Sequence, residues 1–101
     1  MNLRTVLGEV PVEQITLADG HAHAWIKPPP SVMDDDAPIL DDYDAITAEL
    51  EDFRAAGGAA LVDCQPGGCG RDARMLANLS DVTGLHITAT TGFHLKRYYP
   101  L

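Results

Sequence analysis

The chain has 101 residues, of which 46% are hydrophobic, and a formal net charge of −8, values that fit one globular domain but not two. The acidic balance argues against nucleic-acid binding and against docking on an anionic membrane, because both need Lys and Arg to neutralise phosphate. No stretch reaches the ~20 apolar residues of a membrane span, and the first residues lack the apolar run of a signal peptide, so we expect a cytoplasmic protein.

The first third of the chain predicts β-structure followed by a long loop. Residues 2–14 contain two short β-like pieces around Gly8-Glu9, which fits either a small hairpin or an entry strand. The segment from Ile15 to Ile26 predicts a first buried strand. Three consecutive prolines at 28–30 continue neither a strand nor a helix, so a loop follows. We interpret the acidic run Asp34 to Asp36 as a solvated part of that loop.

Two helices and two further strands are predicted in alternation. Apolar side chains recur every three or four residues from Asp42 to Ala56, which predicts a helix. The apolar run 59–64 predicts a strand buried on both faces. A second helix is predicted from Asp72 to Thr83 and a third strand from Leu85 to Thr91. The order βαβαβ indicates an α/β protein with a parallel sheet and right-handed crossovers.

The most informative stretch is Asp19-Gly20-His21-Ala22-His23. Alternate strand residues share a face, so His21 and His23 point the same way. Two imidazoles one pleat apart can bind one cation, and the end of a parallel barrel strand is where active sites are built. A hydrogen-bonded histidine pair without metal is the competing interpretation. Asp19 is either an orienting acceptor for a ligand or a polar residue at the strand end.

Two other histidines and a carboxylate carry weaker signals. His86 begins the third strand, at the stability end of a barrel, and is expected to be structural. His94 follows that strand at the opposite rim, where it is either a loop residue or a contact to substrate or metal. Asp63, near the end of the second strand, is expected to be a hydrogen-bonded structural carboxylate.

The cysteines and glycines after the second strand predict no separate site. Cys64 and Cys69 are expected to be reduced thiols, because a Cys-x4-Cys pair without further partners is a weak zinc signal. Gly67-Gly68-x-Gly70 matches neither the P-loop nor the dinucleotide fingerprint, so we interpret it as a turn.

Five segments in register resemble the N-terminal third of the phosphotriesterase-like group of the amidohydrolase superfamily. They are Leu7 to Val12, His21 to His23, Ala56 to Cys64, Gly70 to Asp72 and Ala89 to Phe93. The resemblance covers nearly the whole chain and implies a (β/α)8 TIM barrel with one or two divalent metals, usually zinc, at its C-terminal rim. It also implies hydrolysis of phosphotriesters, lactones or related esters by metal-activated water.

The resemblance assigns metal ligation to His21 and His23, and a structural role to Gly70-Arg71-Asp72 in anchoring the second helix. Ala22 stands where some members have Glu, so that position is not expected to be a ligand. The family's other ligands are a carbamylated lysine on the fourth strand, two later histidines and an aspartate on the eighth strand. Lys96 follows the third strand and is not that lysine.

We therefore interpret residues 1–101 as a single N-terminal fragment of a metal-dependent hydrolase barrel, truncated after its third strand. Its inner sheet face and strand edges would be open, and two histidines fall short of the three protein ligands of a catalytic zinc. The isolated chain is thus expected to be inactive, whereas the full-length form is expected to hydrolyse a small-molecule ester-type substrate.

Two alternatives remain open. The chain could be a noncatalytic short module that hides its open sheet in a homo-oligomer or against a partner. The full-length form could instead be a metal-dependent deoxyribonuclease of the same superfamily, although the acidic charge and the stretches 70–72 and 91–93 favour the phosphotriesterase-like branch. The substrate and the catalytic residues are not predicted, because specificity in such barrels resides mainly in the later βα loops.

Overall fold

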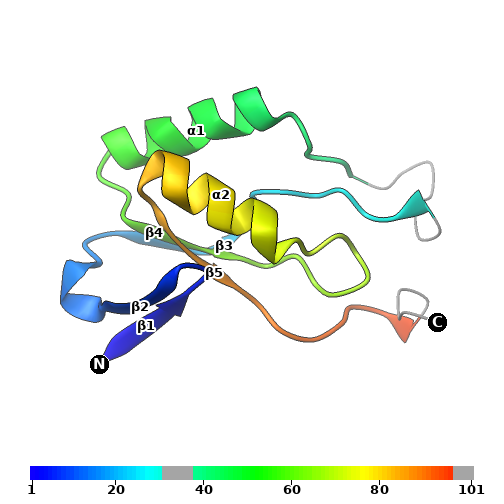
Figure 1. Ribbon diagram of the computed structural model, residues 1–101, viewed down its shortest axis with the longest axis horizontal. Coiled ribbons are helices and arrows are strands. Elements are labelled where there is room, and N and C mark those ends of the chain that lie inside the picture. Colours follow the sequence, from blue (N-terminus) through cyan, green and yellow to red (C-terminus); the bar gives the residue numbers. More distant parts are fainter. Residues whose placement is uncertain (31–37, 97–101) are drawn as a thin grey trace.

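The computed structural model describes residues 1–30 and 38–96, and the acidic run Asp34 to Asp36 lies outside them (Figure 1). The elements are β1 (Asn2–Thr5), β2 (Gly8–Pro11), a 3-10 turn η1 (Val12–Gln14), β3 (Ala18–Ala22), α1 (Tyr43–Ala55), β4 (Ala60–Asp63), α2 (Ala73–Thr83) and β5 (His86–Ala89). From β3 onward the predicted βαβαβ order is confirmed. Within these residues, no helix is long and apolar enough to cross a membrane.

In the described part of the chain, β3, β4 and β5 form a parallel sheet with β4 in the centre. Ala60 of β4 lies opposite Ala18 on one side and His86 on the other. Both helices lie on the same face of this sheet (Figure 1). The carboxyl ends of the three strands therefore meet at one edge, which is where residues 22–23, 63–65 and 89–90 come together.

The first parallel strand is shorter and more exposed than predicted. The sequence predicted a buried strand from Ile15 to Ile26, but β3 covers only Ala18–Ala22 and residues 18–21 are exposed. The prediction of burial was wrong: β3 is an edge strand that pairs with β4 alone among the described residues, and its residues Ala18 to His21 are small or polar and bring little apolar surface to bury. Ile26 leaves the sheet and pairs with Leu40 instead.

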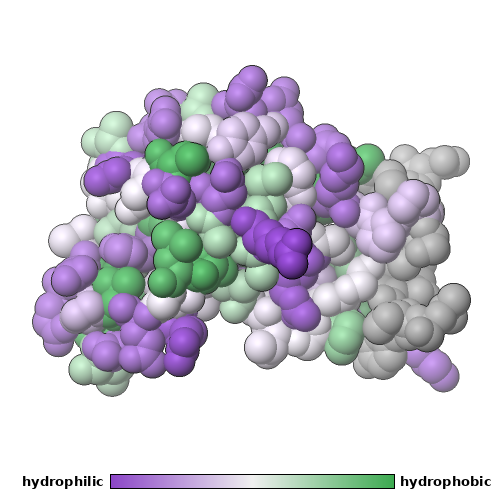
Figure 2. Space-filling model, in the orientation of Figure 1, coloured by the Kyte–Doolittle hydropathy of each residue, from purple (hydrophilic) through white to green (hydrophobic). Residues whose placement is uncertain are grey.

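The core fills the space between the helices and the sheet. Its fully buried apolar side chains include Leu76 and Leu79 of α2, Leu85 just before β5, and Ile87 in β5. Ile46 and Leu50 of α1 belong to the same cluster of buried side chains. Each such side chain contributes about 2 kcal/mol through the area it removes from water. Hydrophilic residues cover much of the outer surface of the helices, with apolar patches between α2 and the N-terminal hairpin (Figure 2).

Both helices begin at an aspartate that caps the first turn. The side chain of Asp42 accepts a hydrogen bond from the Ala45 N–H at 3.0 Å, and that of Asp72 accepts one from the Met75 N–H at 3.0 Å. Each bond satisfies one N–H that has no partner within its helix. At its other end α2 stops at Gly84, whose φ of 76° lies in the left-handed region that glycine adopts without strain.

The predicted N-terminal hairpin is confirmed, but its turn lies two residues earlier than expected. β1 pairs antiparallel with β2, and the turn is Val6-Leu7 rather than Gly8-Glu9. The Thr5 hydroxyl fixes this turn, donating to the Gly8 carbonyl at 2.7 Å and accepting from the Leu7 N–H at 3.2 Å. The Val6 N–H donates to the Ile87 carbonyl at 2.8 Å, so the hairpin covers part of the β5 edge that was expected to be open.

Candidate functional site

The two histidines of the sequence motif lie side by side at the carboxyl end of β3. His21 is on the strand, and His23 follows its last residue. Their ring centroids are 5.5 Å apart and the rings meet edge to face, with an interplanar angle of 64°. Both side chains are exposed. The pair therefore presents two imidazoles to the space above the strand ends.

The separation of the two rings is compatible with a shared metal ion. A zinc ion at about 2.1 Å from a ring nitrogen lies roughly 3.2 Å from that ring's centroid, so two ligating imidazoles have centroids at most roughly 6.4 Å apart. The observed separation falls inside this limit. Residues 1–30 and 38–96 contain no cluster of three or more His, Cys, Asp or Glu side chains that could hold a metal. A metal site at this histidine pair would therefore need donors beyond the described residues.

A glutamine that the sequence analysis did not single out holds one of the rings. The Oε1 atom of Gln65 lies 2.9 Å from His23 Nδ1. Gln65 is 7% exposed, and its Nε2 donates to the carbonyl of Cys69. The available signal was its position two residues after Asp63, at the carboxyl end of the central strand, where barrel strands place functional side chains.

Asp63 is the structural carboxylate that was expected. It is 1% exposed, and its side chain accepts hydrogen bonds from the Ala24 N–H at 2.7 Å and the Gln65 N–H at 3.4 Å. In addition, the Cys64 N–H donates to the Ala22 carbonyl at 2.7 Å. These bonds join the end of β4 to the backbone on both sides of His23.

The other residues that the sequence singled out are Asp19, His86, His94 and the two cysteines. The Asp19 carboxylate accepts from the backbone N–H of His21 at 3.0 Å, which favours its interpretation as a strand-end polar residue. His86 begins β5, at the end of the sheet away from His23, where it was expected. His94 is exposed in the segment after β5. Cys64 and Cys69 are thiols.

The segment Gly70-Arg71-Asp72 has the structural role that the resemblance implied, with an additional contact. Asp72 caps α2, and Arg71 reaches across to the segment after β5. Its Nη1 donates to the carbonyls of Thr90 and Gly92, both at 3.1 Å. The loop after β4 and the segment after β5 are therefore fixed to each other beside the candidate site.

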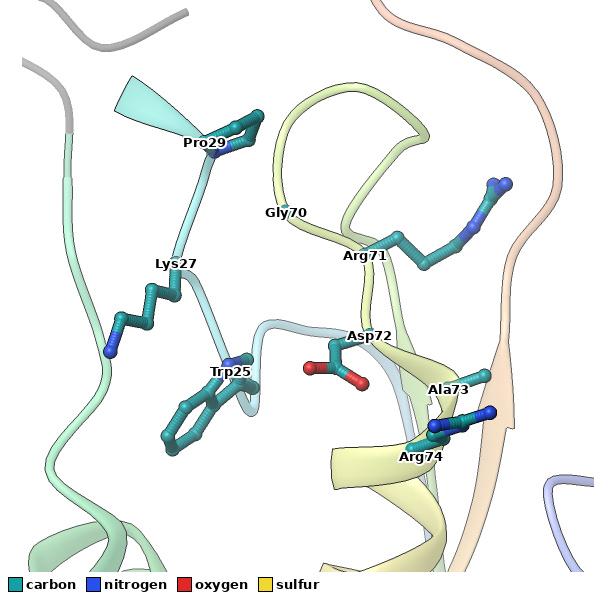
Figure 3. A pocket seen from close by; sticks show the side chains of 8 residues that line it. All are labelled: Trp25, Lys27, Pro29, Gly70, Arg71, Asp72, Ala73 and Arg74. Atoms are coloured by element: carbon teal, nitrogen blue, oxygen red, sulfur yellow. The ribbon is translucent and has the colours of Figure 1, made fainter. Parts of the chain in front are cut away.

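A cleft of about 600 Å³ lies between residues 25–29 and 70–74, and neither His21 nor His23 lines it. Its cationic side chains diverge (Figure 3). Lys27 points toward Asp41, with 3.8 Å between Nζ and Oδ2, while Arg71 points toward the segment after β5. Lys27 and Arg71 thus point apart and do not converge on a common point in the cleft.

Comparison with known proteins identifies the family. A sequence profile of the phosphotriesterase family matches residues 1–101. The chain belongs to the phosphotriesterase family. Among curated members, the phospho-furanose lactonase of Mycoplasmopsis synoviae is 32% identical over 99 residues, covering 95% of this chain and 28% of the relative. The N-acetyltaurine hydrolase of Bos taurus is 39% identical over 71 residues, covering 70% of this chain and 20% of the relative.

Solved structures of the phosphotriesterase family superpose on the same residues. A lactonase from Listeria monocytogenes gives a TM-score of 0.85 at 29% identity, covering 98% of this chain and 30% of that one. The organophosphorus hydrolase from Deinococcus radiodurans gives 0.73 at 31% identity, covering 92% and 29%. The chain thus spans less than a third of the length of these relatives, and its sheet and helices are a portion of their TIM-barrel fold. The predicted fold class and family are confirmed.

Proposed function

We propose that residues 1–101 form the N-terminal part of a metal-dependent hydrolase that cleaves an ester-type bond in a small molecule. In this proposal His21 and His23 are the ligands that the first barrel strand supplies to a divalent metal. The observation that carries it is the pair of imidazoles at the carboxyl end of β3, with ring centroids 5.5 Å apart. Membership of a family of hydrolases gives the reaction class.

Zinc is the metal we propose first, because neutral imidazole is one of its usual ligands, although cobalt, nickel and iron accept the same donor. A bound divalent metal would polarise the scissile group and make a nearby water acidic enough to deprotonate near neutral pH. A catalytic zinc takes three protein ligands, and the described residues bring two together. We therefore expect residues 1–101 to be inactive by themselves and the complete protein to supply the remaining donors.

A lactone is the substrate class that we propose, because two of the matched proteins with the highest coverage of this chain are lactonases. These are the phospho-furanose lactonase of Mycoplasmopsis synoviae and the lactonase of Listeria monocytogenes. An N-acyl amide is the second candidate, since the bovine N-acetyltaurine hydrolase is 39% identical to the matched segment. Both substrates have a carbonyl that a metal can polarise.

The test is a rate measurement on the complete protein loaded with zinc. Lactones, phosphotriesters and N-acetylated amines are assayed for hydrolysis, first with the parent protein and then with His21→Ala and His23→Ala. Loss of a ligand's hydrogen-bond partner typically lowers activity roughly 10- to 100-fold. Each substitution removes a proposed ligand itself and is therefore expected to lower kcat by more than that. His86→Gln, at the other end of the sheet, is the matched control and should retain activity.

The same protein distinguishes the alternatives. Hydrolysis that persists after chelation and in both histidine variants would overturn the metal assignment. A monodisperse oligomer without metal or hydrolase activity would instead support a noncatalytic module. Cleavage of DNA without lactone or amide hydrolysis would support the deoxyribonuclease alternative, which the net charge of −8 disfavours.

A further inference from the structure

We propose that Gln65 is a positioning residue that fixes His23 in the tautomer with hydrogen on Nδ1 and so directs its Nε2 lone pair toward the metal. This inference rests on the proposed metal-binding function, but its first test needs no metal. Two hydrogen bonds carry it: one links the Cys69 carbonyl to the Gln65 amide, and the other links the Gln65 amide to the His23 ring.

The direction of each hydrogen bond follows from the chemistry of its atoms. A backbone carbonyl only accepts, so the end of the Gln65 amide that faces the Cys69 carbonyl must be the NH2 group. The other end is then the amide oxygen, which also only accepts. It lies 2.9 Å from His23 Nδ1, so Nδ1 must be the donor. A neutral imidazole that donates from Nδ1 has its lone pair on Nε2.

The Gln65 side chain is held in place by its surroundings, which fixes the direction of both hydrogen bonds. The side chain is 7% exposed, and the residue lies two positions after the buried Asp63 that ends the central strand. Its backbone N–H donates to the Asp63 carboxylate at 3.4 Å. The Cys69 N–H donates to the Pro66 carbonyl at 3.2 Å, which closes the turn and sets the Cys69 carbonyl beside the amide. Reversing the amide would place two acceptors together and an NH2 group against the ring nitrogen.

The arrangement has a consequence for metal affinity. Histidine ligands of metals usually donate from the second ring nitrogen to an acceptor that fixes tautomer and ring orientation, and loss of that acceptor typically weakens binding 10- to 100-fold. Here the acceptor is the Gln65 amide oxygen. Removing it should allow His23 to rotate and to exchange tautomers, which lowers the fraction of molecules ready to bind.

The first test measures the tautomer in the complete, metal-free protein labelled with 15N-histidine. At alkaline pH, where imidazoles are neutral, long-range 1H–15N spectra distinguish a protonated Nδ1 from a protonated Nε2. We expect His23 of the parent protein to carry its proton on Nδ1. Gln65→Met should lose this preference, whereas Gln65→Glu should keep it because a carboxylate oxygen still accepts from Nδ1. A proton on Nε2 in the parent, or an unchanged tautomer in Gln65→Met, would overturn the proposal.

The second test measures zinc binding by isothermal titration with the parent, Gln65→Met and the control Gln14→Met, which makes the same change at an exposed glutamine of η1. Gln65→Met is expected to raise the Kd at least about tenfold and Gln14→Met to leave it unchanged. Equal Kd values in all three would count against a positioning role. If the parent binds no zinc, the proposed function fails while the tautomer result still decides whether Gln65 orders His23.

Discussion

The carboxylate of Asp63 accepts a hydrogen bond from the backbone N–H of Ala24 at 2.7 Å, across the boundary between β4 and the segment that follows β3. The two residues are far apart in the chain, and both are buried. Ala24 directly follows His23, so this bond fixes the backbone at the point where the proposed ligand leaves the strand. A charged acceptor with a backbone donor makes a stronger bond than two neutral groups do.

Replacement of Asp63 should therefore destabilise the protein and disturb the histidine pair together. Asp63→Ala removes the acceptor and leaves the Ala24 N–H buried without it, which is expected to lower the free energy of unfolding by about 2–3 kcal/mol. Asp63→Asn keeps one oxygen acceptor and should lose less. Urea unfolding of the complete protein measures the loss of stability in Asp63→Ala and in Asp63→Asn. Asp81→Ala, at an exposed position of α2, is the control and should change stability by at most about 0.5 kcal/mol.

Truncation of a core side chain of α2 gives a second prediction. Leu79 is 0% exposed and packs in the cluster between the helices and the sheet. Leu79→Ala leaves a cavity there and should lower the free energy of unfolding by about 2–5 kcal/mol. Val82 on the same helix is 47% exposed, so Val82→Ala should have a much smaller effect. Similar losses for the two variants in denaturant unfolding would contradict the placement of the core.

The fold was largely predictable from local signals. Apolar spacing located both helices to within a residue, since α1 spans Tyr43–Ala55 and α2 spans Ala73–Thr83. The first parallel strand was the main error. Among the described residues β3 pairs on one side only, and this pairing is set by tertiary structure that its own residues do not encode.

The site was half predictable. The juxtaposition of His21 and His23 was predicted from their spacing, which places both imidazoles on one strand face, and metal ligation by them stays a prediction. Asp63 was singled out because it ends an apolar run. Gln65 was missed, since its proposed role depends on the Cys69 carbonyl in the turn after β4 and on the His23 ring, which directly follows β3. A side chain whose proposed role depends on a ring 42 residues away in the chain leaves no periodic signal.

The cap of α2 supports a third prediction. Asp72 accepts a hydrogen bond from the Met75 N–H at 3.0 Å, so Asp72→Ala should lower the free energy of unfolding by about 1 kcal/mol. Asp72→Asn keeps the acceptor and should recover most of the loss. The equivalent change Asp42→Ala removes the cap of α1 and provides a comparison of the same kind. Thermal unfolding in which Asn and Ala behave alike would argue against a capping role.

Arg71 gives the fourth prediction, because one guanidinium nitrogen joins two segments. Its Nη1 donates to the carbonyls of Thr90 and Gly92, each at 3.1 Å, which ties the start of α2 to the segment after β5. Arg71→Ala is expected to lower the free energy of unfolding by about 1–2 kcal/mol. The loss should also be local, with faster amide hydrogen exchange around residues 90–95 than in β4.

Arg74→Ala is the control that distinguishes loss of the two Arg71 hydrogen bonds from loss of positive charge. It is exposed and lines the same cleft as Arg71, so Arg74→Ala removes an equal charge from the same end of α2 without removing either bond to the segment after β5. Hydrogen exchange around residues 90–95 should then match that of the parent. If both variants accelerate exchange equally, the effect comes from lost positive charge. If only Arg71→Ala does, the two carbonyl contacts hold the segment that borders the proposed site.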